Sequence, residues 1–260
     1  MLKIPTMAEM AAKGETPEIL FWVGCAGSFD DRYKKVTGAF IKILNHIGVS
    51  FAVLGTEESC TGDPAKRAGN EFLFQMQAVN NIQVLNGYAV KKIVTACPHC
   101  FNTLKNEYPV LGGNYEVLHH SQFLQQLINA GKIRLKDGGE FKGKRITFHD
   151  SCYLGRANDI YEAPREVIEL LDVELVEMKR AKAKGLCCGA GGAQMFKEAE
   201  HGHKEVNHER TEDALETGAK VVAVGCPFCM TMLADGMKRH NKENEIKVYD
   251  LAEMLAASLA

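Results

Sequence analysis

The residues best suited to chemistry in this chain are its nine cysteines, two of which stand side by side in the glycine-rich run GLCCGAGG (residues 185–192). The adjacent pair, Cys187 and Cys188, is poorly placed to form a disulfide. It is also unusual for ordinary zinc or cubane sites, whose ligands are spaced by two or more residues. Glycines around the pair let the backbone approach closely. We therefore expect this loop to close around a bulky group.

Four more cysteines form two Cys-x-x-Cys turns, CPHC (97–100) and CPFC (226–229), each after an apolar run. Such a turn at a helix start aims two sulfurs at one centre, where free amide groups favour the thiolate. Proline suits the first helical position because its missing N–H would have no helical partner there. Cytoplasmic proteins seldom contain structural disulfides, so these cysteines indicate metal binding or redox chemistry.

The cysteines recur in register, which indicates two copies of one unit. A separation of 127 residues relates Cys25 to Cys152 and Cys60 to Cys187, and 129 residues relate the two Cys-x-x-Cys turns. The segments VLHHSQFL (117–124) and VYDLAEML (248–255) also align. We place an N-terminal extension at 1–18, a first domain at 19–139 and a second at 140–260, with the boundary in the Gly- and charge-rich run KDGGEFKGK.

Each copy alternates apolar strands with helical patterns. The expected strands are EILFWVG, VSFAVLG, KKIVTA and YEVLHH in the first copy, and RITFHDSC, VELVEM, KVVAVG and IKVYDL in the second. Expected helices include a stretch with Phe72, Met76, Val79 and Leu85, and a polar helix over 205–216. The predicted fold class is α/β with two pseudo-symmetric repeats, each a mostly parallel sheet flanked by helices.

Four cysteines follow predicted strands directly, and function in open α/β folds gathers at the carboxyl ends of strands. These four are Cys25, Cys97, Cys152 and Cys226. The sequence therefore predicts one site in each copy.

Composition limits the classes of partner. The net charge is −2 and the sequence pI about 6.5, which argue against binding to nucleic acid or to a membrane surface by charge. No apolar run approaches the roughly 18 residues of a spanning helix, and the first residues do not resemble a secretory signal. We expect a cytoplasmic protein that reaches the inner membrane surface only through a partner.

Three kinds of site fit the cysteines. A thioredoxin-like dithiol would use a single Cys-x-x-Cys turn and leaves the other cysteines unexplained. Structural zinc fits four thiolates in the first copy but leaves a fifth in the second. An iron–sulfur cluster has several irons to ligate, so that five thiolates and a glycine-lined pocket suit it best.

The pattern of the second copy resembles the cysteine-rich CCG domain, which is known from heterodisulfide reductase and usually occurs as a tandem pair. Cys152 is followed after 34 residues by Cys187-Cys188-Gly189, and after 37 residues from Cys188 by Cys226-Pro227-Phe228-Cys229. The resemblance implies a non-cubane [4Fe-4S] cluster on five ligands, with Gly189 and Gly191 beside it. Those ligands would be Cys152, Cys187, Cys188, Cys226 and Cys229.

The first copy departs from the family pattern because Thr61 stands where the second copy has Cys188. Its remaining candidate ligands are Cys25, Cys60, Cys97 and Cys100. A second [4Fe-4S] cluster with four ligands, an altered site and an empty site all stay open.

Within the family, FWVGCAGSFDDR and CTGDPAKRAGNE are most similar to the cytoplasmic end of membrane oxidoreductases linked to electron-transfer flavoprotein. The resemblance implies an iron–sulfur oxidoreductase subunit that passes electrons toward a quinone-linked membrane chain. Its implied partners are a membrane-anchored or ferredoxin-type iron–sulfur subunit and electron-transfer flavoprotein or a flavin dehydrogenase. The alternatives are a catalytic subunit that reduces a disulfide or supports hydroxy-acid oxidation, and a plain dithiol oxidoreductase.

Other polar residues have simpler interpretations. The run HGHKEVNH (201–208) is typical of a solvated helix face. His149 and His99 lie close to cysteines in sequence and are candidates to donate to a cluster sulfur or to carry protons. Arg156 and Arg210 are candidates to meet an anionic substrate.

Overall fold

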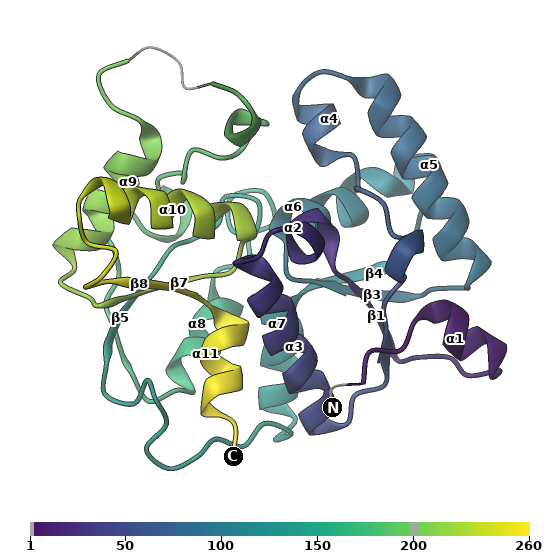
Figure 1. The fold of residues 1–260 in the computed structure, drawn as a ribbon, viewed down its shortest axis with the longest axis horizontal. Helices are drawn as coiled ribbons and strands as arrows, with labels where there is room; N and C mark the ends of the chain where they lie inside the picture. The colour runs from purple at the N-terminus through teal and green to yellow at the C-terminus, as the bar shows by residue number, and fades with distance from the viewer. Residues whose placement is uncertain (1–2, 199–201) are drawn as a thin grey trace. The chain divides into compact units, whose positions relative to one another are not determined.

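The computed structural model describes residues 3–198 and 202–260 of the 260-residue chain. The chain divides into two compact units, Met1–Phe123 and Leu124–Ala260. Each unit contains one four-stranded sheet (Figure 1). In the described residues, no helix has the length and apolar character that a membrane span requires.

The sheet of the first unit is parallel throughout, in the order β2-β1-β3-β4. Its strands are β1 (Ile19–Trp22), β2 (Phe51–Ala52), β3 (Lys92–Thr95) and β4 (Glu116–His119). Its α-helices are α1 (Met7–Ala12), α2 (Gly24–Phe29), α3 (Tyr33–Ile47), α4 (Asp63–Arg67), α5 (Glu71–Gly87) and α6 (Pro98–Asn102). Short turns of other helix types are η1 (Gly55–Glu57), η2 (Thr103–Glu107) and η3 (Tyr108–Leu111). Helix α7 (His120–Asn129) follows β4 directly and contains the division between the units.

The second unit repeats this plan, with a parallel sheet in the order β6-β5-β7-β8. Its strands are β5 (Arg145–Phe148), β6 (Glu174–Leu175), β7 (Val221–Val224) and β8 (Lys247–Asp250). Helices α9 and α10 lie on one side of this sheet and α8 and α11 on the other (Figure 1). Their bounds are α8 (Glu162–Glu169), α9 (Val206–Glu216), α10 (Pro227–Arg239) and α11 (Leu251–Ser258), with short turns η4 (Lys182–Lys184) and η5 (Gln194–Phe196).

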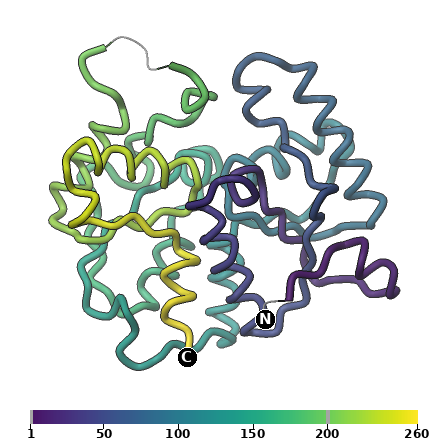
Figure 2. The backbone as a smooth tube through the Cα atoms, viewed as in Figure 1, coloured from purple at the N-terminus to yellow at the C-terminus, as the bar shows by residue number. Residues whose placement is uncertain are grey.

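The predicted α/β class with two pseudo-symmetric repeats is confirmed, and Figure 2 lets the two chain paths be followed by colour. All four residues of β1 and of β7 are buried. This is typical of parallel strands covered on both faces, which read as continuous apolar runs. The second strand of each unit is only two residues long, shorter than its apolar run suggests, because only those residues pair with β1 or β5.

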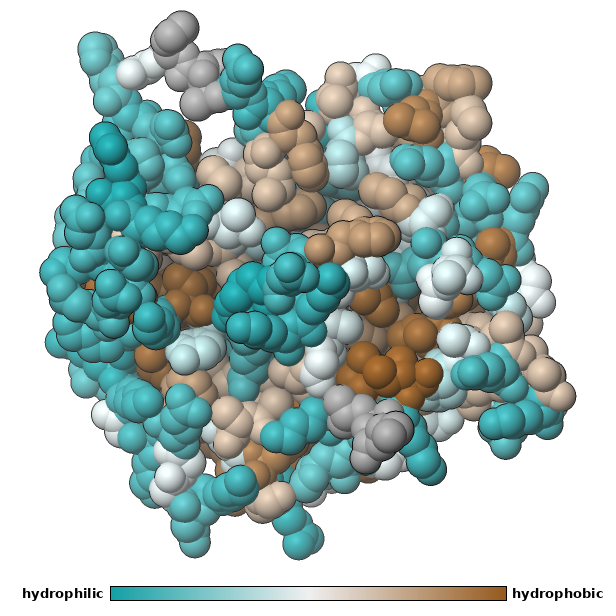
Figure 3. All heavy atoms as spheres, viewed as in Figure 1, coloured by the Kyte–Doolittle hydropathy of each residue, from teal (hydrophilic) through white to brown (hydrophobic). Residues whose placement is uncertain are grey.

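Helix α5 differs from the sequence-based expectation in the face that it buries. The helix forms as predicted, but among the four apolar residues that indicated it, only Leu85 is buried. Phe72, Met76 and Val79 are exposed, and hydrophobic side chains are visible over the N-terminal part of α5 in Figure 3. The buried face instead contains Phe74 and the polar Asn81, together with Ala78, Ile82 and Leu85.

Candidate functional site

The five cysteines of the second unit meet at the carboxyl end of its sheet. Cys152 follows β5, Cys226 caps α10, and Cys229 lies in the first turn of that helix. The side chains contact one another in the order Cys152–Cys187–Cys188–Cys229–Cys226. All nine cysteines of the chain lie in its described part, and none forms a disulfide there. The structure thus brings together all five residues that the sequence grouped, including the adjacent pair.

Hydrogen bonds within this group favour one thiolate. Bonds from Cys152 and then Cys188 hold the pKa of the Cys187 thiol well below its usual range, and the amide of Gly189 donates to the same sulfur at 3.3 Å. The pKa of Cys152 is raised by its bond to Cys187 and by burial. The pKa of Cys229 is raised by its bonds to neighbouring sulfurs and by burial. A cation at this place would displace the shared protons and bind several soft sulfur ligands.

The two glycines predicted to lie beside a cofactor differ in their surroundings. Gly189 has φ +92°, in the region that favours glycine, and a Cβ there would lie 3.4 Å from Met232 Cε and from Val206 Cβ. Its conformation aims its amide at Cys187. A Cβ on Gly191 would meet no atom within 4 Å. The close neighbours of residue 189 therefore explain why a glycine stands there, whereas a side chain at residue 191 would have open space around it.

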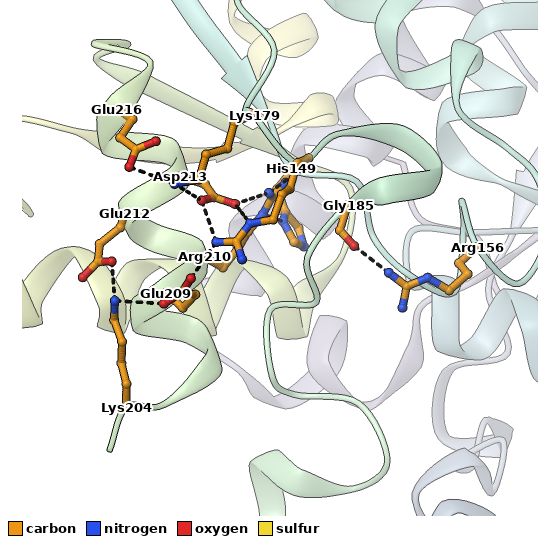
Figure 4. A network of polar contacts seen from close by, with 11 residues as sticks. His149, Arg156, Lys179, Gly185, Lys204, Glu209, Arg210, Glu212, Asp213 and Glu216 are labelled. Carbon is orange, nitrogen blue, oxygen red and sulfur yellow. Dashed lines mark hydrogen bonds and ion pairs between the residues drawn. The ribbon is translucent and has the colours of Figure 1, made fainter. Parts of the chain in front are cut away.

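His149 and Arg210 belong to a network of polar contacts (Figure 4). Arg210 from α9 donates through Nε to His149 Nδ1 at 2.9 Å and forms an ion pair with Asp213 at 3.1 Å. Burial and the Arg210 charge lower the pKa of His149 to about 3. A ring nitrogen of His149 and the Sγ atoms of Cys188 and Cys229 all lie within 4.8 Å of one another.

This network changes the interpretation of Arg210. Its side chain is fully buried, so it does not face solvent or a substrate there. Arg156 is exposed and donates to the carbonyl of Gly185 at 2.5 Å, which ties it to the loop before Cys187 (Figure 4).

A second ion pair positions the same loop. The buried Asp150 carboxylate accepts two hydrogen bonds from Arg165, at 2.9 and 3.0 Å, and one from the amide of Lys182 at 2.7 Å. Arg165 also pairs with Glu177. Asp150 therefore joins the end of β5 to the segment that leads into Cys187.

The first unit gathers its four cysteines in the same way. Cys25 hydrogen-bonds to Cys60, and Cys97 to Cys100. Cys25 and Cys60 also contribute to the raised pKa of Cys100, after its bond to Cys97 and burial, so the two pairs lie near each other. Thr61 is buried, and its hydroxyl lies 3.9 Å from Cys100 Sγ. This matches the contact of Cys188 with Cys229 in the second unit.

The backbone around Cys60 repeats that around Cys187. The amide of Gly62, which has φ +88°, donates to Cys60 Sγ at 3.5 Å, as Gly189 does to Cys187. The bond from Cys25, with that of Gly62, lowers the pKa of Cys60 to about 6. Both units therefore hold one favoured thiolate at the corresponding position.

Two residues that the sequence did not single out fix the Cys60 loop. Asn81 of α5 is fully buried and donates to the Cys60 carbonyl at 2.9 Å and to Tyr108 Oη at 3.0 Å. Tyr108 donates to the Thr61 carbonyl at 3.1 Å. Asn81 resembles any surface polar residue of a helix in sequence, so no local signal marks it.

The carboxylate of Glu58 holds the turn at Cys25. It accepts hydrogen bonds from the amides of Val23 and Gly24, at 3.0 and 2.6 Å. Removal of this carboxyl from solvent raises the pKa of Glu58 to about 7.

The remaining histidines are placed as follows. His99 is buried and pairs with Asp63 through Nδ1 at 2.9 Å. His203 is exposed, and His208 lies 3.9 Å from Glu205, while His201 lies outside the described residues. Hydrophilic side chains dominate the left of Figure 3, where α9 is. His203 is thus solvated but precedes α9, whereas the His208 side chain on α9 is only 21% exposed and packs against His240, so the prediction of a solvated helix face does not hold for His208.

A family model for the cysteine-rich domain, CCG, matches residues 19–105 and 146–234. The chain belongs to this family, with two tandem copies of the domain. Its relatives include a protein named probable iron-sulfur-binding oxidoreductase FadF from Bacillus subtilis, 48% identical over 99% of this chain and 36% of that protein. An EtfAB:quinone oxidoreductase of Syntrophomonas wolfei is 45% identical over 93% of this chain and 34% of that protein. The chain thus spans about a third of the length of these two relatives.

A third relative is named for disulfide reduction. It is a component of the dihydromethanophenazine:CoB–CoM heterodisulfide reductase of Methanosarcina barkeri, 36% identical over 93% of this chain and 59% of that protein. All three relatives are named as oxidoreductases or as part of a reductase, which supports the assignment of this chain to an oxidoreductase family.

Proposed function

We propose that this chain is the iron–sulfur electron-transfer part of an oxidoreductase, with a non-cubane [4Fe-4S] cluster in the second unit. The observation that carries the proposal is the unbroken contact of five cysteine sulfurs there. The proposed ligands are Cys152, Cys187, Cys188, Cys226 and Cys229. The FadF relative is named as an iron-sulfur-binding oxidoreductase and the Syntrophomonas wolfei relative as a quinone oxidoreductase, and both names support electron transfer by this chain.

The surroundings fit such a group better than the alternatives. A zinc ion takes four tetrahedral ligands, which leaves one sulfur of the second unit over. A dithiol needs two sulfurs, whereas Cys229 contacts Cys188 as well as Cys226. His149 Nε2 is buried and has no hydrogen-bond partner among the described residues, although sulfur ligands lie close to the ring. A cluster with bridging sulfides would offer that nitrogen an acceptor.

We extend the proposal to the first unit, where four cysteines would hold a second [4Fe-4S] cluster with one protein ligand fewer. Thr61 occupies the position of Cys188, and its buried hydroxyl lies toward Cys100 as Cys188 lies toward Cys229. The four-thiolate set is that of ordinary clusters.

The protein residues would bind, orient and shield these groups. When bound, a cluster supplies one-electron oxidation and reduction at sulfur-ligated iron. The start of α10 presents free amides to the anionic group, with Pro227 at the first helical position. Cys188, Cys226 and Cys229 are buried, whereas Cys152 and Cys187 are partly exposed. Electrons would therefore enter or leave past that exposed edge.

The proposed partners follow from the relatives. We propose that electrons arrive from electron-transfer flavoprotein or another flavin dehydrogenase, and leave toward a quinone-linked membrane chain through a membrane-anchored or ferredoxin-type subunit. A second candidate function is disulfide reduction at the second unit. The partial exposure of Cys152 and Cys187 favours it, since a substrate sulfur could reach that edge.

The test is to purify the chain without oxygen and to measure iron, acid-labile sulfide and zinc per polypeptide. About eight iron with matching sulfide supports both sites, and about four supports one. Cys226→Ser and Cys97→Ser then assign each group of iron to its unit. Zinc without sulfide, or folded active protein without metal, would overturn the proposal.

The two candidate functions differ in the oxidant that the reduced protein reacts with, so they can be tested with two oxidants. Dithionite-reduced protein is mixed in one experiment with a soluble quinone through a ferredoxin-type mediator, and in another with an aliphatic disulfide. Thiol release in the second experiment would favour disulfide reduction over simple electron transfer.

A further inference from the structure

The hydrogen bond between Arg210 and His149 fixes which ring nitrogen of His149 carries the proton. An arginine guanidinium is always protonated and can only donate. Because Arg210 Nε donates to His149 Nδ1 at 2.9 Å, Nδ1 must present its lone pair. A neutral imidazole has one N–H, which is then on Nε2. A ring protonated on Nδ1 would oppose the Arg210 donor, so the observed hydrogen bond itself requires the neutral ring.

That Nε2–H group is a donor without an acceptor. Nε2 is buried and has no hydrogen-bond partner in residues 3–198 and 202–260. Proteins rarely leave a buried polar atom unpaired, and such an atom calls for an explanation, of which a bound group is one. Candidate acceptors lie in the cysteine site, since a ring nitrogen of His149 and the Sγ atoms of Cys188 and Cys229 all lie within 4.8 Å of one another.

The same hydrogen bond argues against His149 as a metal ligand. Coordination through the Nε2 lone pair of a neutral ring requires the proton on Nδ1. That proton would then point at the Nε–H of Arg210, and two donors cannot form a hydrogen bond with each other. The ring in its observed orientation is therefore built to donate.

Arg210 is itself held in place from several sides. Its Nη1 pairs with Asp213 at 3.1 Å and donates to the Arg180 carbonyl at 2.6 Å. Asp213 also pairs with Arg180 at 2.7 Å. These contacts prevent Arg210 from turning away from His149.

We propose that His149 donates an Nε2–H hydrogen bond to a sulfur atom of the cluster held at Cys188 and Cys229, and that Arg210 is the positioning residue that selects this tautomer. The inference rests on the proposed cluster in the second unit. A donor to a cluster sulfur stabilises the reduced, more negative state and raises the reduction potential. His149 would thus set the potential of the second unit without ligating iron.

The first test uses the wild-type protein with its cluster in place, labelled with ¹⁵N-histidine and exchanged into D₂O. We expect pulsed EPR of the paramagnetic state to show one weakly coupled exchangeable proton together with weak ¹⁵N coupling. Fe–S stretching bands in the resonance Raman spectrum should shift on deuteration. Strong ¹⁵N coupling, typical of a ligand bound to iron, would overturn the proposal.

The second test compares variants by iron content and by potential. His149→Phe keeps a planar ring without a donor, and His149→Gln keeps a side-chain N–H. His203→Gln is the control, because His203 is exposed. At a fixed ambient potential we expect His149→Phe to lower the ratio of reduced to oxidised cluster about tenfold, which is about 59 mV for one electron. The Gln variant should recover part of this change, and the control none.

The outcomes separate this inference from the proposed function. Wild-type protein without iron and sulfide would remove the cluster and with it both proposals. Full iron in wild type and in His149→Phe, with unchanged potential and no deuterium effect, would leave the cluster and overturn the role of His149. If the His149→Phe variant does not bind iron, the EPR and Raman spectra of the wild-type protein still test the role of His149.

Discussion

The buried ion pair between Arg210 and Asp213 gives the sharpest expectation about stability. Replacing Arg210 by Met keeps most of the apolar stem but removes the charge and three contacts, to His149, Asp213 and the Arg180 carbonyl. Both members of the pair have side chains with no exposed surface. Breaking a buried pair by removing one partner costs about 3–5 kcal/mol, because the other charge is left in a poorly solvated place.

The neighbours of Asp213 place the cost near the lower end of that range. Asp213 retains Arg180 at 2.7 Å and Lys179 at 3.3 Å, so its charge does not lose every partner. The nitrogen of His149 and the carbonyl of Arg180 each lose a donor, which adds about 1–3 kcal/mol per unsatisfied group if no water replaces it. We therefore expect Arg210→Met to lower the free energy of unfolding of the second unit by at least about 3 kcal/mol.

Hydrogen exchange followed by mass spectrometry measures this effect unit by unit in the loaded protein. A loss of about 3 kcal/mol corresponds to exchange about a hundredfold faster in peptides from β5, β7 and α9. Peptides from β1 and β3 serve as the internal reference. The control variant is Arg156→Met, because Arg156 is exposed and its hydrogen bond to Gly185 contributes only about 0.5–1.5 kcal/mol. Equal effects of the two substitutions would refute the reasoning from burial.

Three further substitutions test the packing and the sites. Gly236→Ala would place a Cβ 2.0 Å from Thr211 Oγ1, so we expect α9 and α10 to separate at a cost of about 1–3 kcal/mol, measured as a lower melting temperature. Asn81→Leu leaves the Cys60 loop without its buried donor and should reduce iron only in the first unit, by metal analysis. Thr61→Cys should change the EPR spectrum of the first unit toward that of the second, whereas an unchanged spectrum would show that a fifth cysteine is not enough.

Much of the site could be predicted because the cysteine motifs coincide with the sequence patterns of strand ends and helix starts. Strong apolar runs end directly before Cys97 and Cys226, and proline follows each of them, so the helix start and the strand end are both visible. Repetition at a constant spacing then paired Cys60 with Cys187. The structure adds that the glycine two residues later donates to the sulfur in both units.

The buried polar residues that hold the cysteine loops and His149 in place could not be predicted, for a physical reason. The buried face of α9 contains Arg210, Asp213 and Thr211 rather than a stripe of apolar residues, so its periodicity resembles that of a solvated helix. The partners that make burial acceptable come from distant segments, as His149 does from 61 residues away. On α5 the opposite ambiguity arises, because apolar residues occur on both faces and hydrophobicity alone does not indicate which face is buried.

The two units share a backbone but differ in the groups that would set a potential. Trp22 and His149 each stand three residues before the first cysteine of their unit, and both have a buried ring nitrogen with no partner in the described parts of the chain. The indole N–H of Trp22 can only donate, whereas the tautomer of His149 is fixed by Arg210. The second unit also has a fifth cysteine where the first has Thr61. Hydrogen bonds and the number of ligands both influence the reduction potential of an iron–sulfur cluster. We therefore expect clusters bound in the two units to have unequal reduction potentials, and such a difference would give electron transfer between them a direction.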